Sequence, residues 1–298
     1  MAVCWSGVFP AINILLRSMD VFTSVFLRFW WAAVILLVLL RWREHRLPRL
    51  SPREAVLVVT LGLIGISLYN SLFSAALTIV EASRAALIVP TNPAFTAVFA
   101  ALFLKERLGG LRAVGVALSV AGALWVLGRG DPRVLAALEL GPGELLLVVC
   151  IFLWSAYTLL GRLALFRLSP LALTAYVMVA GSLPMAIPAW FEHDSLARVS
   201  GESWAALAYL VVFGTVLPFL WFYEGVKTLG AARASQFINL VPPLAVTESI
   251  LILGEPFTPA LLVGTVMVMA GLYLTNKPRG VRAWNVGVVG GNKDQTPP

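Results

Sequence analysis

The sequence carries little charge and few residues of the kinds that bind metals or form disulfides. Only 12% of its 298 residues are charged, whereas 59% are hydrophobic and the mean hydropathy is +0.88. A soluble core cannot bury that much apolar surface, so the composition predicts an integral membrane protein. The two cysteines, Cys4 and Cys150, and the two histidines, His45 and His193, are far apart in sequence. They indicate neither a disulfide framework nor a metal centre.

Motifs for nucleotide and nucleic-acid chemistry are missing as well. No G-x-x-x-x-G-K-[ST] phosphate loop occurs, and no nucleophile or metal constellation is found within the hydrophobic segments. The net charge of +7 comes from Lys and Arg at the ends of hydrophobic segments rather than on one basic face. We therefore expect no catalytic activity, no cofactor and no nucleic-acid partner, and an energy source in an ion gradient or the substrate itself.

Hydrophobic segments separated by short polar loops predict an all-α protein of ten transmembrane helices. Each segment approaches the length that a helix needs to cross a hydrocarbon core of ~30 Å. The expected spans are residues 2–16, 21–40, 55–77, 82–103, 110–127, 143–161, 170–190, 204–226, 231–253 and 258–275. The lipid bilayer is therefore an expected partner.

Lys and Arg residues divide unevenly between the two sides of this arrangement. Alternate loops place sixteen of them on one side and five on the other, and Arg28 lies inside a span. Because cytoplasmic loops are enriched in these residues, the rich side is predicted to be cytoplasmic, with both termini inside. This pattern predicts a multi-pass protein of the cell inner (plasma) membrane.

The two halves of the sequence repeat each other at an offset of 149 residues. At this offset Trp5 aligns with Trp154 and Gly65 with Gly214. The alignment holds without a gap over five spans. We predict repeats over residues 1–128 and 143–276, an external linker over 129–142 and a disordered cytoplasmic tail over 277–298. Five spans per repeat is an odd number, so the second repeat should be inverted relative to the first.

These segments carry a resemblance to a known family. The stretches concerned are CWSGVFPAI, LRF, ASRAALIVPTNPAFTAVFAALFLKERL and GVALSVAGALWV in the first half, and LWFYEGVKTLGAARASQFINLVPPLAV and LGEPFTPALLVGTVMVMAGLYL in the second. Together they resemble the EamA family of the drug/metabolite transporter superfamily. The resemblance implies a ten-helix inner-membrane carrier, usually an exporter of amino acids or related metabolites.

One span in each half contains prolines and polar residues that lipid cannot satisfy. In the ninth span, Gln236, Asn239, Pro243 and Thr247 share one face of a helix, which we expect to line a cavity. Prolines within a helix would also free backbone carbonyls for a substrate ammonium, or would merely shape packing. The helix breaks are expected at Pro90 and Pro93 in the fourth span and at Pro242 and Pro243 in the ninth. Asn92 and Asn239 are candidates for hydrogen bonds to a zwitterion, or for ordinary contacts between helices.

Polar and aromatic residues in the other spans are candidates for the same cavity. They are Trp5, Tyr69, Asn70, Trp154 and Tyr157. Aromatic walls suit a cavity that holds and releases apolar solutes. Anchoring at the membrane interface is the alternative for such rings.

Arg28 and Glu248 are ionisable groups at comparable depth inside their spans. A charge there is costly unless it is paired or hydrated, so their matching depth motivates a contact between the two. Glu248 is alternatively a candidate proton carrier, because burial disfavours the charged carboxylate.

Small residues recur on one face of the fifth and tenth spans. Gly115 and Gly122 correspond to Gly264 and Gly271, and such residues let helices approach closely. We expect them to pack the two repeats together, while the choice between monomer and homodimer stays open.

The sequence as a whole thus predicts a secondary transporter that exports small organic solutes, amino acids or their derivatives first, by alternating access. An intramembrane enzyme or a non-transporting membrane scaffold is the alternative. An enzyme would require a catalytic constellation that the spans lack, and a scaffold would not require broken polar helices in both halves.

Overall fold

The protein is a helical bundle in this computed structural model. The structure describes residues 1–45, 47–91, 109–131, 133, 141–164, 168–192, 196, 198–218, 220–221 and 240–276, and none of these forms a strand. Three helical segments are long and apolar enough to cross a membrane by length and composition, namely Val21–Glu44, Pro52–Leu77 and Pro170–Phe191. Shorter apolar helices cover Ala2–Leu15, Ala113–Val126, Pro142–Tyr157, Gly201–Val216, Val241–Leu253 and Pro259–Thr275.

The first half of the chain contains eight helices within the described residues. In chain order they are α1 (Ala2–Ser6), α2 (Val8–Leu15), α3 (Val21–Glu44), α4 (Pro52–Leu61), the π-helix η1 (Gly62–Leu68), α5 (Tyr69–Leu77), α6 (Ala82–Ile88) and α8 (Gly110–Leu127). A 3₁₀ turn, η2 (Val89–Thr91), follows α6. The predicted break at Pro90 therefore coincides with the end of an α-helix.

The second half supplies the remaining described helices. They are α10 (Pro142–Ala164), α11 (Pro170–Ser182), the 3₁₀ turn η3 (Leu183–Met185), α12 (Ala186–Phe191), α13 (Gly201–Val211), the π-helix η5 (Val212–Val216), α16 (Val241–Leu253) and α17 (Pro259–Asn276). The span expected over 82–103 is described only as far as Thr91.

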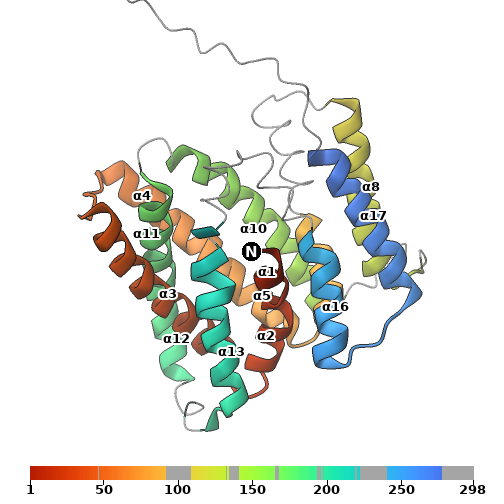
Figure 1. Cartoon of the computed structure of the whole chain (residues 1–298), viewed down its shortest axis with the longest axis horizontal. Helices are drawn as coiled ribbons and strands as arrows, with labels where there is room; N and C mark the ends of the chain where they lie inside the picture. Colours follow the sequence, from red (N-terminus) through yellow and green to blue (C-terminus); the bar gives the residue numbers. More distant parts are fainter. Residues whose placement is uncertain are drawn as a thin grey trace, which may run out of the picture.

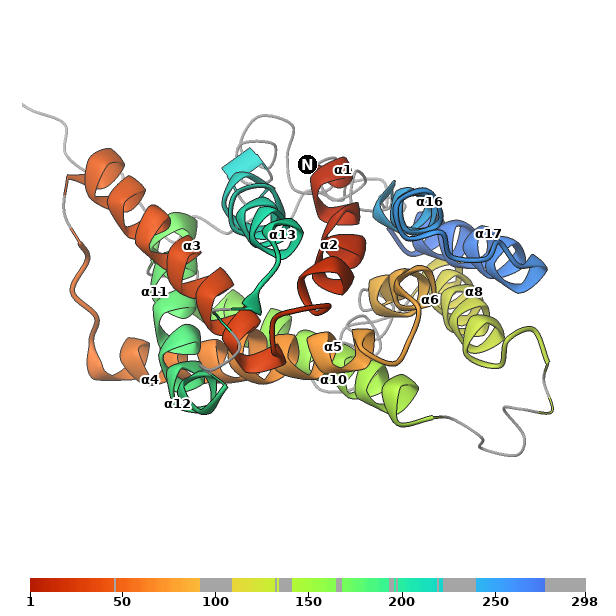
Figure 2. The same cartoon turned by 90° about the horizontal axis from the view of Figure 1, so that it is seen from below.

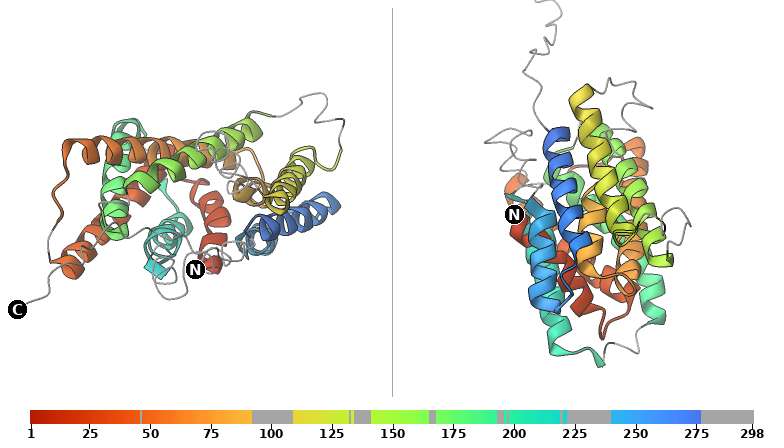
Figure 3. Two further views of the ribbon diagram at one scale, coloured as in Figure 1. Left: turned by 90° about the horizontal axis from the view of Figure 1, so that it is seen from above. Right: turned by 90° about the vertical axis from the view of Figure 1, so that its right-hand side faces the viewer.

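The helices form an elongated bundle with its central elements between two end groups. Figure 1 shows α3, α4, α11 and α12 at one end of the long axis and α8 with α17 at the other. Between them, α2 and α13 lie on one side and α5 and α10 on the other (Figure 2). Figure 3 shows α8 and α17 running side by side along the edge of the bundle.

Glycines bring α8 and α17 into close contact, as predicted. A Cβ atom on Gly115 would lie 2.5 Å from the backbone nitrogen of Thr275, and one on Gly122 would lie 2.9 Å from that of Val268. Contact positions rise along α8 as they fall along α17, so the two helices are antiparallel. At the offset of 149, α8 aligns with α17 itself. The two helices that align at this offset therefore run in opposite directions.

The same relation holds between α3 and the segment formed by α11 and α12, which also align at this offset. At one end, the Ser169 hydroxyl donates to Glu44 Oε1 over 2.5 Å, joining the start of α11 to the end of α3. At the other end, the Thr23 N–H donates to Glu192 Oε2 over 2.7 Å, joining the start of α3 to the end of α12. This pair is antiparallel too.

Carboxylates from the second half cap helices of the first. Besides Glu192 at the start of α3, Glu255 accepts hydrogen bonds from the N–H groups of Ala82 and Ser83, over 2.7 and 2.9 Å. The first N–H groups of a helix lack partners within the helix, and a carboxylate there also complements the helix dipole. The ends of the two halves are thereby joined on the side predicted to be external.

Within the described residues, the prolines of the ninth span lie at the start of a helix. Pro242 and Pro243 occupy the first turn of α16, directly after Val241. Proline is tolerated there because the N–H groups of the first turn have no acceptor within the helix. The residues directly before Leu240, which include Asn239, lie outside the described residues, so the predicted break of the span and the freed carbonyls stay predictions.

Candidate functional site

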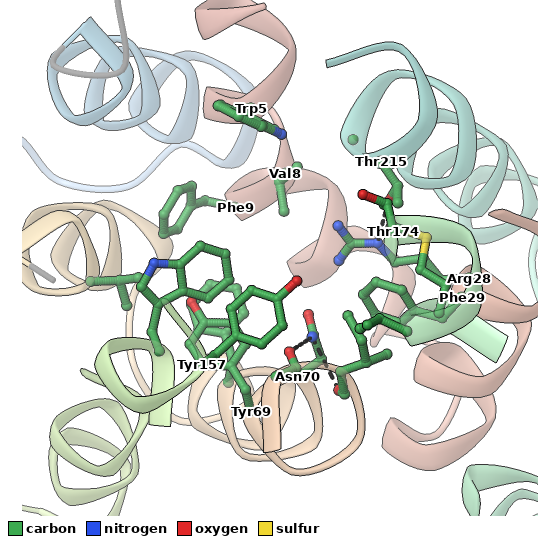
Figure 4. Close-up of a pocket in the computed structure, with 18 of the residues that line it drawn as sticks. Trp5, Val8, Phe9, Arg28, Phe29, Tyr69, Asn70, Tyr157, Thr174 and Thr215 are labelled. Atoms are coloured by element: carbon green, nitrogen blue, oxygen red, sulfur yellow. Dashed lines mark hydrogen bonds between the residues drawn. The ribbon is translucent and has the colours of Figure 1, made fainter. Parts of the chain in front are cut away.

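A cavity of about 300 Å³ lies at the centre of the bundle, between the two halves. Residues from α1, α2, α3, α5, α10, α11, α16, α17, η2 and both π-helices line it, so most of the described elements contribute. Figure 4 shows aromatic rings on one side of this cavity and Arg28 with Thr215 on the other. Its volume lies at the lower end of the range typical for small-molecule sites.

The aromatic side is a run of rings in mutual contact. The ring centroids of Tyr69 and Trp154 are 5.1 Å apart, and those of Trp154 and Tyr157 are 5.4 Å apart. Phe73 stacks on Tyr69 at 5.9 Å and meets Phe9 edge-on at 5.6 Å. Such contacts hold the rings in place, so they form a firm apolar wall rather than separate mobile groups.

Arg28 brings a positive charge to the opposite side. Its side chain comes from α3, is only 8% exposed, and donates from Nε to the hydroxyl of Thr215 over 3.2 Å. Its guanidinium carbon also lies 4.8 Å from the ring centroid of Phe29. Figure 4 shows the guanidinium pointing into the cavity, toward the aromatic side.

Thr215 and Asn70 reach the cavity because of the two π-helices. A π-helical turn leaves a backbone carbonyl without its usual partner, and such turns are frequent at functional sites. Thr215 lies in η5, and its hydroxyl donates to the backbone carbonyl of Leu210, near the end of α13, over 2.9 Å. The Asn70 amide donates to the carbonyls of Gly65 and Ile66 of η1, both over 3.1 Å.

These bonds orient the Asn70 side chain. Because its NH₂ group is used by two carbonyls, the amide oxygen is left to face the cavity, as Figure 4 shows. That oxygen is a hydrogen-bond acceptor available to a solute with an N–H or O–H donor. The cavity therefore combines a cation, an acceptor and an apolar wall.

Five of the residues predicted from sequence to line the cavity do line it, and so does Arg28, which was predicted as an ion-pair residue. The five are Trp5, Tyr69, Asn70, Trp154 and Tyr157. Sequence reasoning missed Phe9, Phe29, Phe73, Thr174 and Thr215, which also line it. The sequence around a phenylalanine or threonine in an apolar span does not show whether the side chain lines a cavity or packs between helices. The alignment of Gly65 with Gly214 was the available signal, since both glycines line the cavity.

Several predicted residues fall elsewhere. Asn92, Pro93, Gln236 and Asn239 lie outside the described residues. Thr247, expected to face the cavity, is exposed and donates to the carbonyl of its own helix at Pro243 over 2.8 Å. The described residue of α16 that lines the cavity is Val241, nearly two helical turns nearer the start of the helix.

Arg28 and Glu248 do not pair as expected from their matching depth. Arg28 binds Thr215, whereas Glu248 Oε1 accepts a hydrogen bond from the Ser6 hydroxyl over 2.8 Å. Their helices, α3 and α16, lie on opposite sides of α2 (Figure 2). Depth along a span does not specify position around the bundle, and this is why the expected ion pair was wrong.

The described residues contain no group of three or more His, Cys, Asp or Glu placed to hold a metal ion. Among the described residues, the functional groups that line the cavity are a guanidinium, an amide, hydroxyls and aromatic rings, and they include no activated nucleophile. The arrangement is suited to reversible binding of a small amphipathic molecule.

Comparison with known proteins gives a consistent result over nearly the whole chain. The model of the "EamA-like transporter family" matches residues 1–128 and 141–277. An uncharacterized transporter of Bacillus subtilis is 31% identical over 82% of this chain and 81% of its own length. A Streptantibioticus cattleyicolor protein named a probable terminal-alkyne amino-acid exporter is 27% identical over 92% of this chain and 90% of its own.

A solved structure, described only as the crystal structure of a protein, shares the fold. It superimposes with a TM-score of 0.64 at 19% identity, covering 92% of this chain and 94% of that one.

Proposed function

The chain belongs to the EamA-like transporter family, and on that premise we propose that it is a secondary transporter that moves amino acids or related small metabolites out of the cell. The uneven distribution of Lys and Arg supports a place in the plasma membrane with both termini inside. The relative named an amino-acid exporter supports the substrate class.

The observation that carries this proposal is a central solute-sized cavity bounded by equivalent helices that run in opposite directions. The pairs α8 with α17, and α3 with α11 and α12, support two inverted repeats. The π-helices support the same relation, because η1 falls on residues 211–217 at the offset of 149 and η5 spans Val212–Val216.

Inverted repeats provide a mechanism for transport. If the two halves exchange conformations, a state open to the inside and a state open to the outside are near mirror images of similar energy. The cavity between the halves then opens to one side at a time. The small solute is carried without covalent chemistry.

The test is counterflow in liposomes that contain the purified protein. Vesicles loaded with each unlabelled amino acid or nucleoside of a panel should accumulate the same labelled solute when that solute is a substrate. Transient accumulation of at least one amino acid is expected, and empty liposomes serve as the control. Folded protein that exchanges no solute of the panel would contradict the proposal.

A further inference from the structure

Arg28 is a cation placed where nothing in the described protein neutralises it. It is the one charged residue among the described residues that line the cavity, and the two terminal nitrogens of its guanidinium have no hydrogen-bond partner there. A charge at such depth is costly unless it meets an opposite charge or water. An anion on a bound solute would supply the missing partner.

The hydrogen bond of Arg28 to Thr215 uses only Nε, so both terminal nitrogens of the guanidinium can donate to a bound solute. Thr215 holds Nε, while its own hydroxyl proton is committed to Leu210 O. The neutral hydroxyl orients the side chain but does not cancel its charge. The terminal nitrogens then face the cavity as a planar pair of donors, which matches the two oxygens of a carboxylate.

We propose that Arg28 is the binding group for the carboxylate of the transported solute, and that Thr215 positions it. The substrate is then a small molecule with one carboxylate and an apolar body, the body resting on the aromatic side formed by Tyr69, Trp154 and Tyr157. Sugars, nucleosides and simple cations lack the anion that this site requires. This inference rests on the proposed transport function and narrows its substrates.

The test compares amino acids with their primary amides, in which an uncharged amide group replaces the carboxylate and the ammonium group is kept. Leucine, phenylalanine and methionine, each paired with its primary amide, are titrated into the full-length protein in detergent while thermal unfolding is followed. A ligand that binds the folded state raises the unfolding temperature with concentration, which yields an affinity. In the wild type, each acid that binds should do so about tenfold to a hundredfold more tightly than its amide, as expected for hydrogen bonds to a charged group.

Two variants test whether Arg28 binds the carboxylate of the solute or only stabilises the folded protein. Arg28→Gln should reduce the ratio of acid to amide affinity to about one, whereas loss of structure would weaken both ligands together. Thr215→Val keeps the shape of the side chain but removes the acceptor for Nε, so the ratio should fall part of the way. Arg17→Gln is the matched control, because Arg17 is exposed and outside the cavity. It should keep the wild-type ratio.

The outcomes distinguish this inference from the proposed function. If the ratio of acid to amide affinity is unchanged in both Arg28→Gln and Thr215→Val, Arg28 is not the binding group for the carboxylate. The same conclusion follows if the wild-type protein binds the amides as tightly as the acids, or binds none of the acids. If Arg28→Gln does not fold, the ratio of acid to amide affinity measured for Thr215→Val decides the test. Failure of transport is seen separately, as absent counterflow by wild-type protein, and it leaves the affinity ratios intact.

Discussion

Glu248 is the residue whose role the structure changes most. Its Oε1 atom accepts the hydrogen bond from Ser6, while Oε2 is buried and has no partner among the described residues. Among the described residues, the partner of this carboxyl group is the neutral hydroxyl of Ser6, and no cation lies within ion-pair distance of it. The residue therefore fits the proton-carrier alternative better than the ion pair with Arg28.

A proton-carrying Glu248 predicts a specific defect in Glu248→Gln. The amide has the same shape and keeps an acceptor for Ser6, but it cannot exchange a proton. Accumulation driven by a pH gradient across liposomes should be lost, while counterflow without a gradient should persist because the binding cavity is intact. Glu202→Gln, a change of an exposed carboxylate, should alter neither. Gradient-driven accumulation by Glu248→Gln at the wild-type rate would rule out this role.

At the scale of helices, close packing depends on the absence of side chains at particular positions. A Cβ atom on Gly271 would overlap Ser119 and lie 2.6 Å from the carbonyl oxygen of Gly115. These neighbours are largely backbone atoms, which cannot rotate away as a flexible side chain does. The contact between α8 and α17 can accept an added methyl group only by moving the helices apart.

Gly271→Ala should therefore destabilise the protein, by about 1–3 kcal/mol if it behaves as typical overpacking does. The expected measurement is a lower unfolding temperature in detergent. Gly110→Ala is a matched control, because a Cβ atom at Gly110 meets nothing within 4 Å. Equal unfolding temperatures for the two variants would mean that the helices separate at no cost.

The whole molecule is held together at the predicted external side by polar contacts between its halves. Besides the caps made by Glu192 and Glu255, Arg84 pairs with Glu144 over 3.1 Å, with both side chains 10% exposed. A transporter that opens to the outside must break contacts of this kind. We expect them to stabilise the conformation described here against an outward-open one.

Removing the two caps should shift that equilibrium. In a cysteine-free background, Val8→Cys places a thiol on the cavity wall. Combining Glu192→Gln with Glu255→Gln should speed its labelling by a membrane-impermeant thiol reagent added outside, because a neutral amide caps a helix start less strongly than a carboxylate. Labelling is followed as a time course on intact cells. The control change Glu202→Gln should leave the rate unchanged, and an unaltered rate in the double variant would contradict the assignment.

Much of the fold and part of the site could be predicted from local sequence. The all-helical class, the family and the glycine contact between α8 and α17 are confirmed, because composition and small residues at a fixed spacing act locally. The presence of Trp5 and Trp154 in one cavity agrees with their alignment at the offset of 149. The predicted ion pair of Arg28 with Glu248 was wrong, and the break at Pro242 and Pro243 stays a prediction.

What the sequence by itself determined is the membrane setting, the repeated register and the residue types available to a cavity, since hydropathy and spacing are properties of the chain alone. Only the tertiary structure decided which side chains meet. The π-helix η5 turns Thr215 toward Arg28, and the separation of α3 from α16 leaves Arg28 without Glu248. Position around a bundle depends on how distant helices pack, and no local pattern encodes it.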